Sequence, residues 1–405
     1  MAAARVIGVI GAGTMGAGIA QLAARSGART ILYDPISEAL RRGALHVAAG
    51  LEKEAARGRG TSQEARTAAE RLETVEDLAA LAPCDLVIEA APERLALKHE
   101  LYARLSEEIL GEECVLASNT SSLLVTAIAA AATCPERVVG MHFFNPAPVM
   151  RLLEVVAGEQ SGERALALAH ATGEAMGKTV IRAADGPGFL VNRCNRPFGL
   201  EALRMLQEQI ADIETIDRIV RMEGGFRMGP FELMDLVGID TGLEISKSFY
   251  EQSFYEPRWQ PSPISARYVA AGLHGRKTGR GYYDYSNDPY RPPDPDPDPD
   301  PPARADAKVQ PAGGGVLERI LCQVINECAF ALGEGVGSAQ DIDTGMMLGL
   351  NYPRGPLAWA DEIGLDHVLA VLDGLWEEYR EERYRPAPAL RRLVRSQGSF
   401  TTPRP

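Results

Sequence analysis

A glycine-rich turn near the N-terminus lies between two short apolar runs, and it constrains the fold more than any other part of the chain. The first run, Val6–Ile10, is typical of a parallel strand that is buried on both faces. A small-residue helix follows at about Thr14–Ser26, and the second apolar run ends at Asp34. The turn has the spacing G-x-G-x-x-G, formed by Gly11, Gly13 and Gly16.

Each part of this segment has a physical role in holding a dinucleotide. The first glycine permits a tight turn, the second lets the backbone approach a pyrophosphate, and the third lets helix and strand pack closely. The helix directs its amide-rich N-terminus toward the phosphates. Asp34 can accept hydrogen bonds from the adenosine ribose and would repel a 2′-phosphate, so the segment predicts NAD in preference to NADP. FAD-binding segments begin in a similar way, and the rest of the chain has to decide between the two cofactors.

Composition narrows the class of protein. The length of 405 residues permits two or three domains, and 45% hydrophobic with 24% charged residues is typical of a soluble globular protein. No apolar stretch reaches the roughly 18 residues that a membrane span needs, so we expect no membrane partner. The net charge of −13 argues against a nucleic-acid partner. The six cysteines form no C-x-x-C pair and the histidines have no metal-ligand spacing, so we expect reduced thiols, no metal and a cytoplasmic location.

Apolar runs alternate with helical patterns from Arg5 to about Val180, which indicates βαβ units in a doubly wound sheet of the Rossmann type. A long charged pattern over residues 36–71 predicts a helical hairpin that protrudes from the sheet. Further strands are expected over residues 85–90, 114–118, 137–141, 151–156 and 178–181, and helices over 95–110, 124–132 and 163–176.

The character of the chain changes at Asp185–Pro187, beyond which only Tyr282–Tyr285 suggests a strand. Alternating proline and aspartate over Pro292–Pro302 predicts an extended, solvated linker. A repeat with a constant separation of 126 residues flanks it. Its matched pairs include Glu201 with Glu327, Glu208 with Glu334, Asp217 with Asp343, Gly229 with Gly355, and Asp235 with Asp361.

The predicted fold is therefore α/β, with an N-terminal Rossmann-type sheet followed by two copies of an all-α domain. We expect an NAD-binding domain over residues 1–184 and a first helical domain over 185–290. A linker over 291–312 and a second helical repeat over 313–405 complete the chain.

One histidine and one glutamate form a candidate catalytic pair. His142 comes directly after the predicted strand 137–141, and Glu154 lies inside the next one, in the run LLEVV. A carboxylate inside an apolar strand is costly unless it is paired, and the short loop lets the two strands lie side by side. Such a pair can accept a proton, as the oxidation of a hydroxyl requires. A purely structural histidine is the alternative.

Three other polar places could contact a ligand. Ser118–Ser122 (SNTSS) follows a strand, where open α/β sheets bind ligands, but these side chains could equally cap the next helix. Asn192 stands where the second domain begins, and could face a ligand or bond to backbone. Lys277 lies in the loop GRKTGRG, which is suited to a phosphate or is a plain basic turn.

Together these segments resemble the L-3-hydroxyacyl-CoA dehydrogenase family, which includes 3-hydroxybutyryl-CoA dehydrogenases. The segments that carry the resemblance run in family order from Val6 to Tyr285: GAGTMGAGI, DLVIEAAPE, SNTSSL, HFFNPAPVMRLLEVV, DGPGFLVNR, GPFELMDLVGID and GRKTGRGYYDY. The resemblance implies NAD as cofactor and an acyl-CoA as substrate. The implied reaction is oxidation of an L-3-hydroxyacyl-CoA to the 3-oxoacyl-CoA, or the reverse reduction.

The resemblance also implies roles for single residues. His142 is the expected base, oriented by Glu154, while Ser121 and Asn192 are expected to hydrogen-bond the substrate oxygens. Besides the three glycines, the residues expected at NAD are Thr14, Met15, Asp34, Glu93, Lys98, Asn145 and Lys277. The basic residues expected at CoA, on the predicted hairpin, are Lys53 and Arg57.

Two departures from the family pattern keep other interpretations open. The hairpin lacks a clear match to the CoA-binding lysine of the family, so a free hydroxy-acid dehydrogenase of the gulonate and lambda-crystallin type is an alternative. The second helical copy has Glu318 where the first has Asn192 and lacks the KTGRG loop, so we expect it to be catalytically silent. An extra silent domain would also suit a non-catalytic NAD-binding protein.

The function of the second copy is a separate hypothesis. It could cover in cis the surface through which single-copy relatives dimerise, which gives either a homodimer or a pseudo-dimeric monomer. The duplicated arrangement resembles the 3-hydroxyadipyl-CoA dehydrogenases, and so raises the expectation of a dicarboxylate acyl group.

Overall fold

The computed structural model describes residues 2–295 and 315–401. It divides into two compact units, which we call the N-terminal unit (Met1–Phe189) and the C-terminal unit (Leu190–Pro405). The linker predicted over residues 291–312 lies mostly outside the described residues. Among the described residues, no helix has both the length and the apolar character that crossing a membrane requires.

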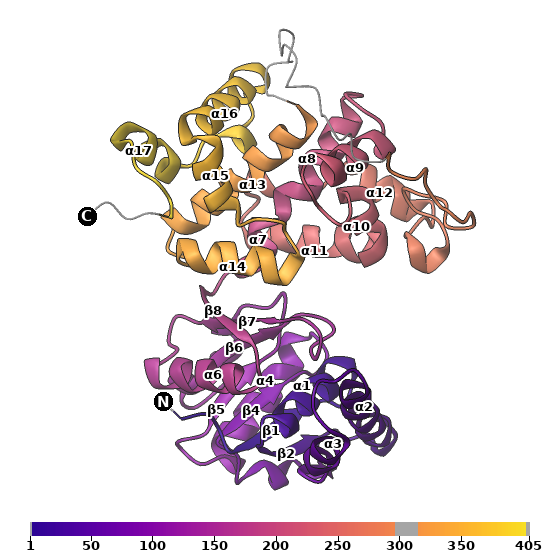
Figure 1. Cartoon of the computed structure of the whole chain (residues 1–405). Coiled ribbons are helices and arrows are strands. Elements are labelled where there is room, and N and C mark those ends of the chain that lie inside the picture. Colours follow the sequence, from indigo (N-terminus) through magenta and orange to yellow (C-terminus); the bar gives the residue numbers. More distant parts are fainter. Residues whose placement is uncertain (1, 296–314, 402–405) are drawn as a thin grey trace. The chain divides into compact units, whose positions relative to one another are not determined.

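The N-terminal unit is built on one eight-stranded sheet with helices on its faces (Figure 1). The strand order is β3-β2-β1-β4-β5-β6-β7-β8, and all neighbours are parallel except β6 and β7. The order reverses direction between β1 and β4, which is where doubly wound sheets bind their ligands. The strands are β1 (Val6–Ile10), β2 (Arg29–Tyr33), β3 (Leu72–Val75), β4 (Leu86–Glu89), β5 (Val115–Ser118), β6 (Val138–Phe143), β7 (Leu152–Ala157) and β8 (Thr179–Ala184).

The apolar runs of the sequence become the centre of this sheet, and the predicted Rossmann architecture is confirmed. Strands β4 and β5 are buried along their whole length, because helices cover both faces of the sheet. The helices of the unit are α1 (Thr14–Arg25), α2 (Ser37–Ala56), α3 (Ser62–Ala69), α4 (Leu95–Arg104), α5 (Val125–Ala129) and α6 (Glu163–Ala175).

Three details differ from the sequence-based expectations. The predicted hairpin exists as α2 and α3, but both helices pack against α1, where Arg25 pairs with Glu54 at 2.8 Å, and do not protrude. Strand β3 was not expected, because it lies at the edge of the sheet and its middle residues are exposed. Tyr282–Tyr285 is not a strand, since this loop contains only isolated backbone bridges, such as Arg280 with Asp284.

The described part of the C-terminal unit is helical (Figure 1). Its first set of helices is α7 (Val191–Cys194), α8 (Arg196–Gln207), α9 (Ile213–Met222), α10 (Pro230–Val237), α11 (Ile239–Gln252) and α12 (Pro263–Ala270). The second set is α13 (Val316–Gly333), α14 (Ala339–Leu350), α15 (Pro356–Ile363), α16 (Leu365–Tyr379) and α17 (Pro388–Ser396).

The repeated Asp, Gly and Pro positions have a common physical cause. The Asp217 carboxylate accepts hydrogen bonds from the amides of Phe231 and Glu232 at 2.9 Å each, at the N-terminus of α10. A Cβ on Gly229 would lie 2.3 Å from the carboxyl carbon of Asp217, so only glycine fits there. Proline can follow at the first helical position, where no amide donor is needed.

The second set of helices uses the same device. The Asp343 carboxylate accepts from the amides of Leu357 (2.8 Å) and Ala358 (2.9 Å), at the start of α15. A Cβ on Gly355 would lie 2.3 Å from the carboxyl carbon of Asp343. The repeat is therefore a repeat of helix-capping geometry as well as of sequence.

The two helical sets meet through α8 and α13, which pack against each other. Buried arginines at equivalent positions bind glutamates of the opposite set, in a reciprocal arrangement typical of a two-fold contact. The ion pairs are Arg193 with Glu327 (2.9 Å) and Glu334 (2.7 Å), and Arg319 with Glu201 (2.5 Å) and Glu208 (2.9 Å). The two sets of ion pairs are equivalent, because a separation of 126 residues relates Arg193 to Arg319, Glu201 to Glu327 and Glu208 to Glu334.

Candidate active site

The glycine turn between β1 and α1 has the shape that a dinucleotide needs. Gly11 has a φ of 97°, which favours glycine, and a Cβ on Gly16 would lie 1.7 Å from the carbonyl oxygen of Gly11. Gly13 is different, because a Cβ there would meet no atom within 4 Å. The fold therefore requires glycine at positions 11 and 16, whereas at Gly13 the backbone faces open space.

Asp34 stands beside this turn, directly after β2. Its Oδ2 accepts a hydrogen bond from the Ala12 amide at 2.9 Å, and its Oδ1 accepts from the Ile36 amide at 3.0 Å. The N-terminus of α1 has no side-chain cap, so its amides remain available to an anion. Thr14 is exposed in the first turn of this helix and Met15 is half-buried. These features fit a dinucleotide: the open backbone at Gly13 and the amides of α1 would hold its pyrophosphate, and Asp34 would hold its ribose.

The loop after β5 is organised by Glu93. One oxygen of this carboxylate accepts from the amides of Ser121 and Ser122 at 3.1 Å each and from the hydroxyl of Thr120. The other oxygen lies 3.2 Å from the Lys98 ammonium. Burial raises the pKa of Glu93, but Lys98 and the hydrogen bonds of the loop outweigh this effect and hold the pKa below its usual value.

Lys98, which is predicted to contact NAD, is enclosed by acidic and hydroxyl side chains. Its ammonium pairs with Glu89 at 2.7 Å, and both side chains are only 1% exposed. Glu89, the last residue of β4, also accepts from the Ser118 hydroxyl at 2.7 Å. Glu89 was not predicted as a site residue, although an acid in the apolar run LVIE indicates a buried partner as clearly as Glu154 does.

His142 and Glu154 are in direct contact. His142 lies inside β6, not after it, and faces Glu154 across the antiparallel pair of β6 and β7. The distance from His142 Nδ1 to Glu154 Oε2 is 2.6 Å, and the two side chains are 7% and 0% exposed. The imidazole also packs against Phe144 and Phe189, with ring centroids 4.7 and 5.6 Å away. Among the described residues, none hydrogen-bonds to Nε2, which leaves this nitrogen for a ligand.

The serine loop and His142 belong to neighbouring strands. Asn119 Oδ1 accepts from the amide of Phe143 at 2.9 Å, which ties the start of the loop to the residue after His142. Ser121 is exposed in this loop, and Asn145 is exposed after β6. Ser121 and Asn145 therefore follow the carboxyl ends of the neighbouring strands β5 and β6, and His142 lies near that end of β6 with Glu154 of β7 facing it.

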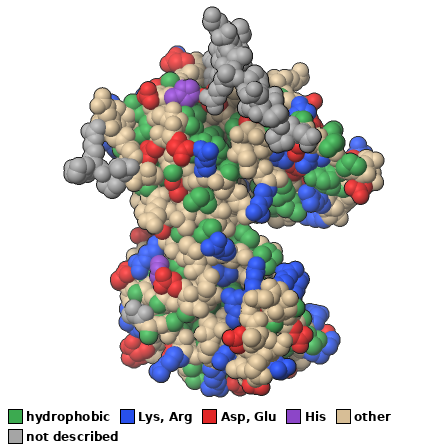
Figure 2. All heavy atoms as spheres, in the orientation of Figure 1, with side chains coloured by type: hydrophobic (Ala, Val, Ile, Leu, Met, Phe, Trp, Pro, Cys, Tyr) green, Lys and Arg blue, Asp and Glu red, His purple; other side chains and the backbone are tan. Residues whose placement is uncertain are grey.

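The other predicted site residues belong to the C-terminal unit and to the end of α2. Asn192 is half-buried on α7 and Lys277 is exposed and paired with Asp240 at 2.6 Å, both in the C-terminal unit. Lys53 and Arg57 are exposed at the end of α2, and neither forms an ion pair with any residue that the structure describes. Figure 2 shows basic and acidic side chains interspersed on the visible face, so an anionic substrate has to be bound by local cations.

A doubly wound sheet with this glycine turn at its reversal point, and with an acid after the second strand, defines a dinucleotide-binding domain of the kind found in NAD-dependent dehydrogenases. Family models extend this assignment. The model described as "3-hydroxyacyl-CoA dehydrogenase, NAD binding domain" matches residues 6–186, and the C-terminal domain model of the same name matches residues 188–285 and 314–400. The chain belongs to the 3-hydroxyacyl-CoA dehydrogenase family.

Individual relatives agree with this assignment. The 3-hydroxyadipyl-CoA dehydrogenase of Escherichia coli K12 is 37% identical, over 96% of this chain and 97% of that protein. A 3-hydroxybutyryl-CoA dehydrogenase of Mycobacterium tuberculosis H37Rv is 39% identical, over 69% of this chain and 98% of that protein. The crystal structure titled 3-hydroxybutyryl-CoA dehydrogenase from E. coli K12 has a TM-score of 0.90 at 36% identity, over 97% of this chain and 98% of that chain.

Membership in this family makes the chain an oxidoreductase that acts on the CH–OH group of 3-hydroxyacyl-CoA substrates, with NAD as its cofactor. The geometry of the glycine turn and Asp34 is consistent with that cofactor. The predictions of family, fold class, reaction and cofactor are thereby confirmed.

Proposed function

We propose that the chain oxidises an L-3-hydroxyacyl-CoA to the 3-oxoacyl-CoA with His142 as the base. The observation that supports this role is the buried pair in which Nδ1 of His142 contacts Glu154 at 2.6 Å while Nε2 has no partner among the described residues. Nδ1 donates its hydrogen to the carboxylate, so the lone pair of the neutral ring is on Nε2. Nε2 is therefore the nitrogen that can accept a proton.

The chain's own groups account for the movement of the proton. His142 Nε2 accepts the proton of the 3-hydroxyl, and Glu154 stabilises the imidazolium that results, because the pair is shielded from water. When bound, NAD supplies the acceptor for the hydride that leaves C3. Ser121 and Asn192 hydrogen-bond the substrate oxygens, and Asp34 selects NAD over NADP.

The loop that carries Ser121 is pre-organised for this role. Glu93 is held below its ordinary pKa and stays ionised, so it continues to accept the amides of Ser121 and Ser122. Lys98 acts through Glu93 and Glu89 as a positioning residue. The hydroxyl of Ser121 itself is exposed and able to meet a substrate oxygen.

We also propose that the second helical set is catalytically silent and covers the α8 surface of the first. The reciprocal ion pairs support a pseudo-dimeric monomer, because Arg193 on α7 and Arg319 on α13 each bind glutamates of the opposite helical set at equivalent positions. Light scattering of the full chain tests this, and a mass of one chain at every concentration is the expected result. We place the protein in the cytoplasm, in keeping with its six cysteines, all of which are free thiols.

Measuring NADH absorbance over a panel of substrates tests the reaction itself. The panel holds 3-hydroxyacyl-CoA thioesters of several lengths and the corresponding free hydroxy acids. We expect turnover of thioesters, and expect His142→Ala to lose turnover while it still binds NAD. Turnover of free acids alone would replace the proposal with a free hydroxy-acid dehydrogenase.

A further inference from the structure

One loop connects the strands that carry His142 and Glu154. It runs from Phe144 to Arg151, between β6 and β7, and contains Asn145, which is predicted to contact NAD. Phe144, at its start, packs against the imidazole of His142 with the ring centroids 4.7 Å apart. The conformation of this loop therefore determines the surroundings of the proposed base.

Two prolines leave the loop short of internal hydrogen bonds, because a proline has no amide hydrogen. The amides of Val149 and Met150 both donate to the carbonyl of Pro146, at 2.9 and 3.0 Å. The carbonyls of Ala147 and Met150 accept from none of the backbone amides that the structure describes. A buried carbonyl without a partner is costly, so these two oxygens need a donor from elsewhere in the chain.

Lys178 is that donor. It stands directly before β8 and is only 8% exposed. Its Nζ donates to the carbonyl of Ala147 at 2.5 Å and to that of Met150 at 2.6 Å, across sequence separations of 31 and 28 residues. Because β7 is antiparallel to β6 and parallel to β8, the start of β8 lies at the end of β6, where the loop begins.

The charge of Lys178 has no other compensation. The ammonium forms an ion pair with none of the carboxylates that the structure describes. Burial and the nearby Arg25 lower the pKa of Lys178 to about 8, although Glu54 acts in the opposite direction. A buried cation is unfavourable unless hydrogen bonds replace its lost water, and here the two loop carbonyls replace it.

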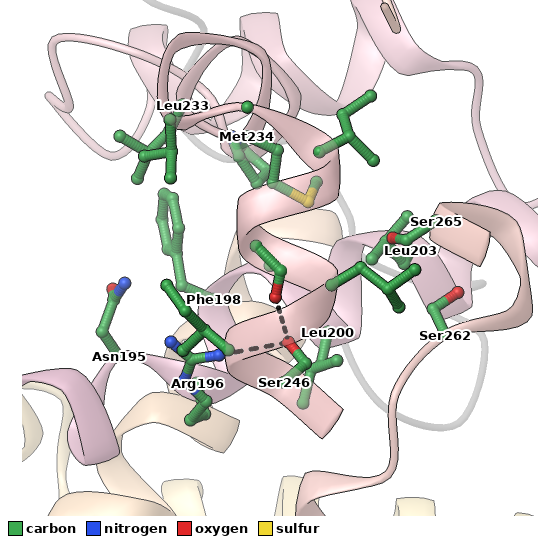
Figure 3. Close-up of a pocket in the computed structure, with 18 residues that line it drawn as sticks. Asn195, Arg196, Phe198, Leu200, Leu203, Leu233, Met234, Ser246, Ser262 and Ser265 are labelled. Carbon is green, nitrogen blue, oxygen red and sulfur yellow. Dashed lines mark hydrogen bonds between the residues drawn. The ribbon is translucent and has the colours of Figure 1, made fainter. Parts of the chain in front are cut away.

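Arg196 in the C-terminal unit shows the local form of such a contact. It lines an apolar cavity between α8, α10, α11 and α12 (Figure 3), where its Nη1 donates to the Ser246 hydroxyl at 3.2 Å. Its Nε donates at 3.3 Å to the carbonyl of Asn192, only four residues earlier. That contact holds one turn of the chain, whereas Lys178 joins distant segments and fixes a loop that belongs to no helix or strand.

The helix that begins at the glycine turn contacts the same loop. A Cβ on Gly18 would lie 3.0 Å from Cδ of Pro148 and 3.2 Å from Cβ of Ala147, so the glycine lets α1 lie directly against the loop. The loop is therefore held both by Lys178 and by the helix whose N-terminus would hold the pyrophosphate. Asn145, exposed in this loop, has a defined place relative to that helix.

We propose that Lys178 is a positioning residue whose ammonium holds the Phe144–Arg151 loop in one conformation, with Asn145 ready to contact NAD beside His142. This inference rests on the proposed function, because it takes the predicted contact between Asn145 and NAD as given. Without Lys178 the loop would adopt several conformations, and NAD would bind only the molecules in which Asn145 is correctly placed. The consequence is weaker binding of the cofactor, with a smaller effect on the chemical step.

Titration with NADH, followed by its fluorescence, measures this consequence without turnover. Lys178→Met keeps an unbranched side chain and removes its donors. We expect the Kd of NADH to rise roughly tenfold or more, as it does when the competent conformation falls to about a tenth of the population. In steady-state kinetics the KM for NAD should rise by a larger factor than kcat falls, whereas a merely structural role would leave that KM unchanged.

Arg137 provides the matched control at the other end of β6. It is 6% exposed, and its Nη1 donates to the carbonyls of Gly111 and Cys114 at 2.6 and 3.3 Å. Arg137→Met therefore also removes a buried cation from two carbonyls, and should lower the melting temperature without changing the Kd of NADH. An equal rise of the Kd in both variants would overturn the inference, because it would show a general loss of structure.

A double-mutant cycle tests whether Lys178 acts through Asn145. Asn145→Ala should itself weaken NADH binding, and adding Lys178→Met should raise the Kd little further. If the two factors multiply in the double variant, the effects are independent and the inference is overturned. Wild-type affinity in Asn145→Ala would overturn it as well.

Hydrogen exchange of the wild-type chain decides the matter if Lys178→Met does not fold. The amides of Val149 and Met150 should already be protected without NADH, and free exchange there would overturn the inference. The proposed reaction fails or stands separately. A chain that turns over no thioester, but binds NADH more weakly after Lys178→Met, would refute the proposed function and leave the role of Lys178 intact.

Discussion

Replacing Glu154 with glutamine tests the proposed base through the carboxylate behind it. The substitution keeps the size of the side chain and removes its charge. His142 Nδ1 and Glu154 Oε2 are 2.6 Å apart, and the side chains are 7% and 0% exposed, so water screens the pair very little. With charge centres about 4 Å apart and an effective dielectric constant of 20, the imidazolium would lose about 4 kcal/mol of stabilisation. If this interaction forms in the transition state, kcat should fall about 1,000-fold.

Steady-state kinetics with a 3-hydroxyacyl-CoA and NAD measure this effect. We expect Glu154→Gln to lower kcat with little change in KM for either substrate, because the carboxylate acts through His142. Binding of NAD, followed by protein fluorescence, should match wild type. The matched control is Glu174→Gln, which removes the acid of an exposed His–Glu pair on α6, where the atoms are 3.6 Å apart. That variant should keep its kcat within about twofold, since exposed pairs contribute little.

A kcat of Glu154→Gln close to that of wild type would refute the assignment of His142 as the base. A folded variant with intact NAD binding and a 1,000-fold loss would support it. A far-ultraviolet circular dichroism spectrum and a thermal melt decide whether the variant is folded.

Three further predictions concern the cofactor turn and the contact between the helical sets. Gly16→Ala places a Cβ 1.7 Å from a backbone oxygen and should lower the free energy of unfolding by about 3 kcal/mol or more. The Cβ of Gly13→Ala meets no protein atom, so this variant should melt like wild type. It should bind NAD at least about tenfold more weakly, because the Cβ occupies the space that the cofactor needs. Fluorescence titration of Asp34→Ala should show a smaller difference between the dissociation constants of NAD and NADP, and an unchanged difference would remove Asp34 from the ribose site. Glu327→Gln removes the carboxylate that Arg193 and Arg258 share, and should lower the free energy of unfolding in urea by about 3–5 kcal/mol. The control Glu377→Gln, at an exposed pair with Arg380, should lower it by less than about 1 kcal/mol.

Features that depend on neighbouring residues in the sequence could be predicted from the sequence. The turn at Gly11, its strand and its helix form one local unit, and an apolar run such as Leu86–Glu89 indicates a buried strand wherever it lies in the sheet. Strand β3 could not be found in this way, because its edge position leaves Glu73 and Thr74 exposed and removes the apolar signal.

Contacts over long sequence separations were predictable only where an unusual residue signalled a partner. Glu154 is such a residue, since an acid in an apolar strand has to be paired. Glu89 is another, since it ends the apolar strand β4 and is paired with the buried Lys98.

The reciprocal contact between α8 and α13 has both of its halves in one polypeptide, which changes its physical behaviour. Closing it is a unimolecular event, so dilution cannot separate the faces as it separates the subunits of a dimer. A substitution at Arg193 is also not mirrored at Arg319, whereas in a symmetric dimer every change occurs twice across the axis. Each face can therefore tolerate damage, or acquire a new side chain, independently of the other.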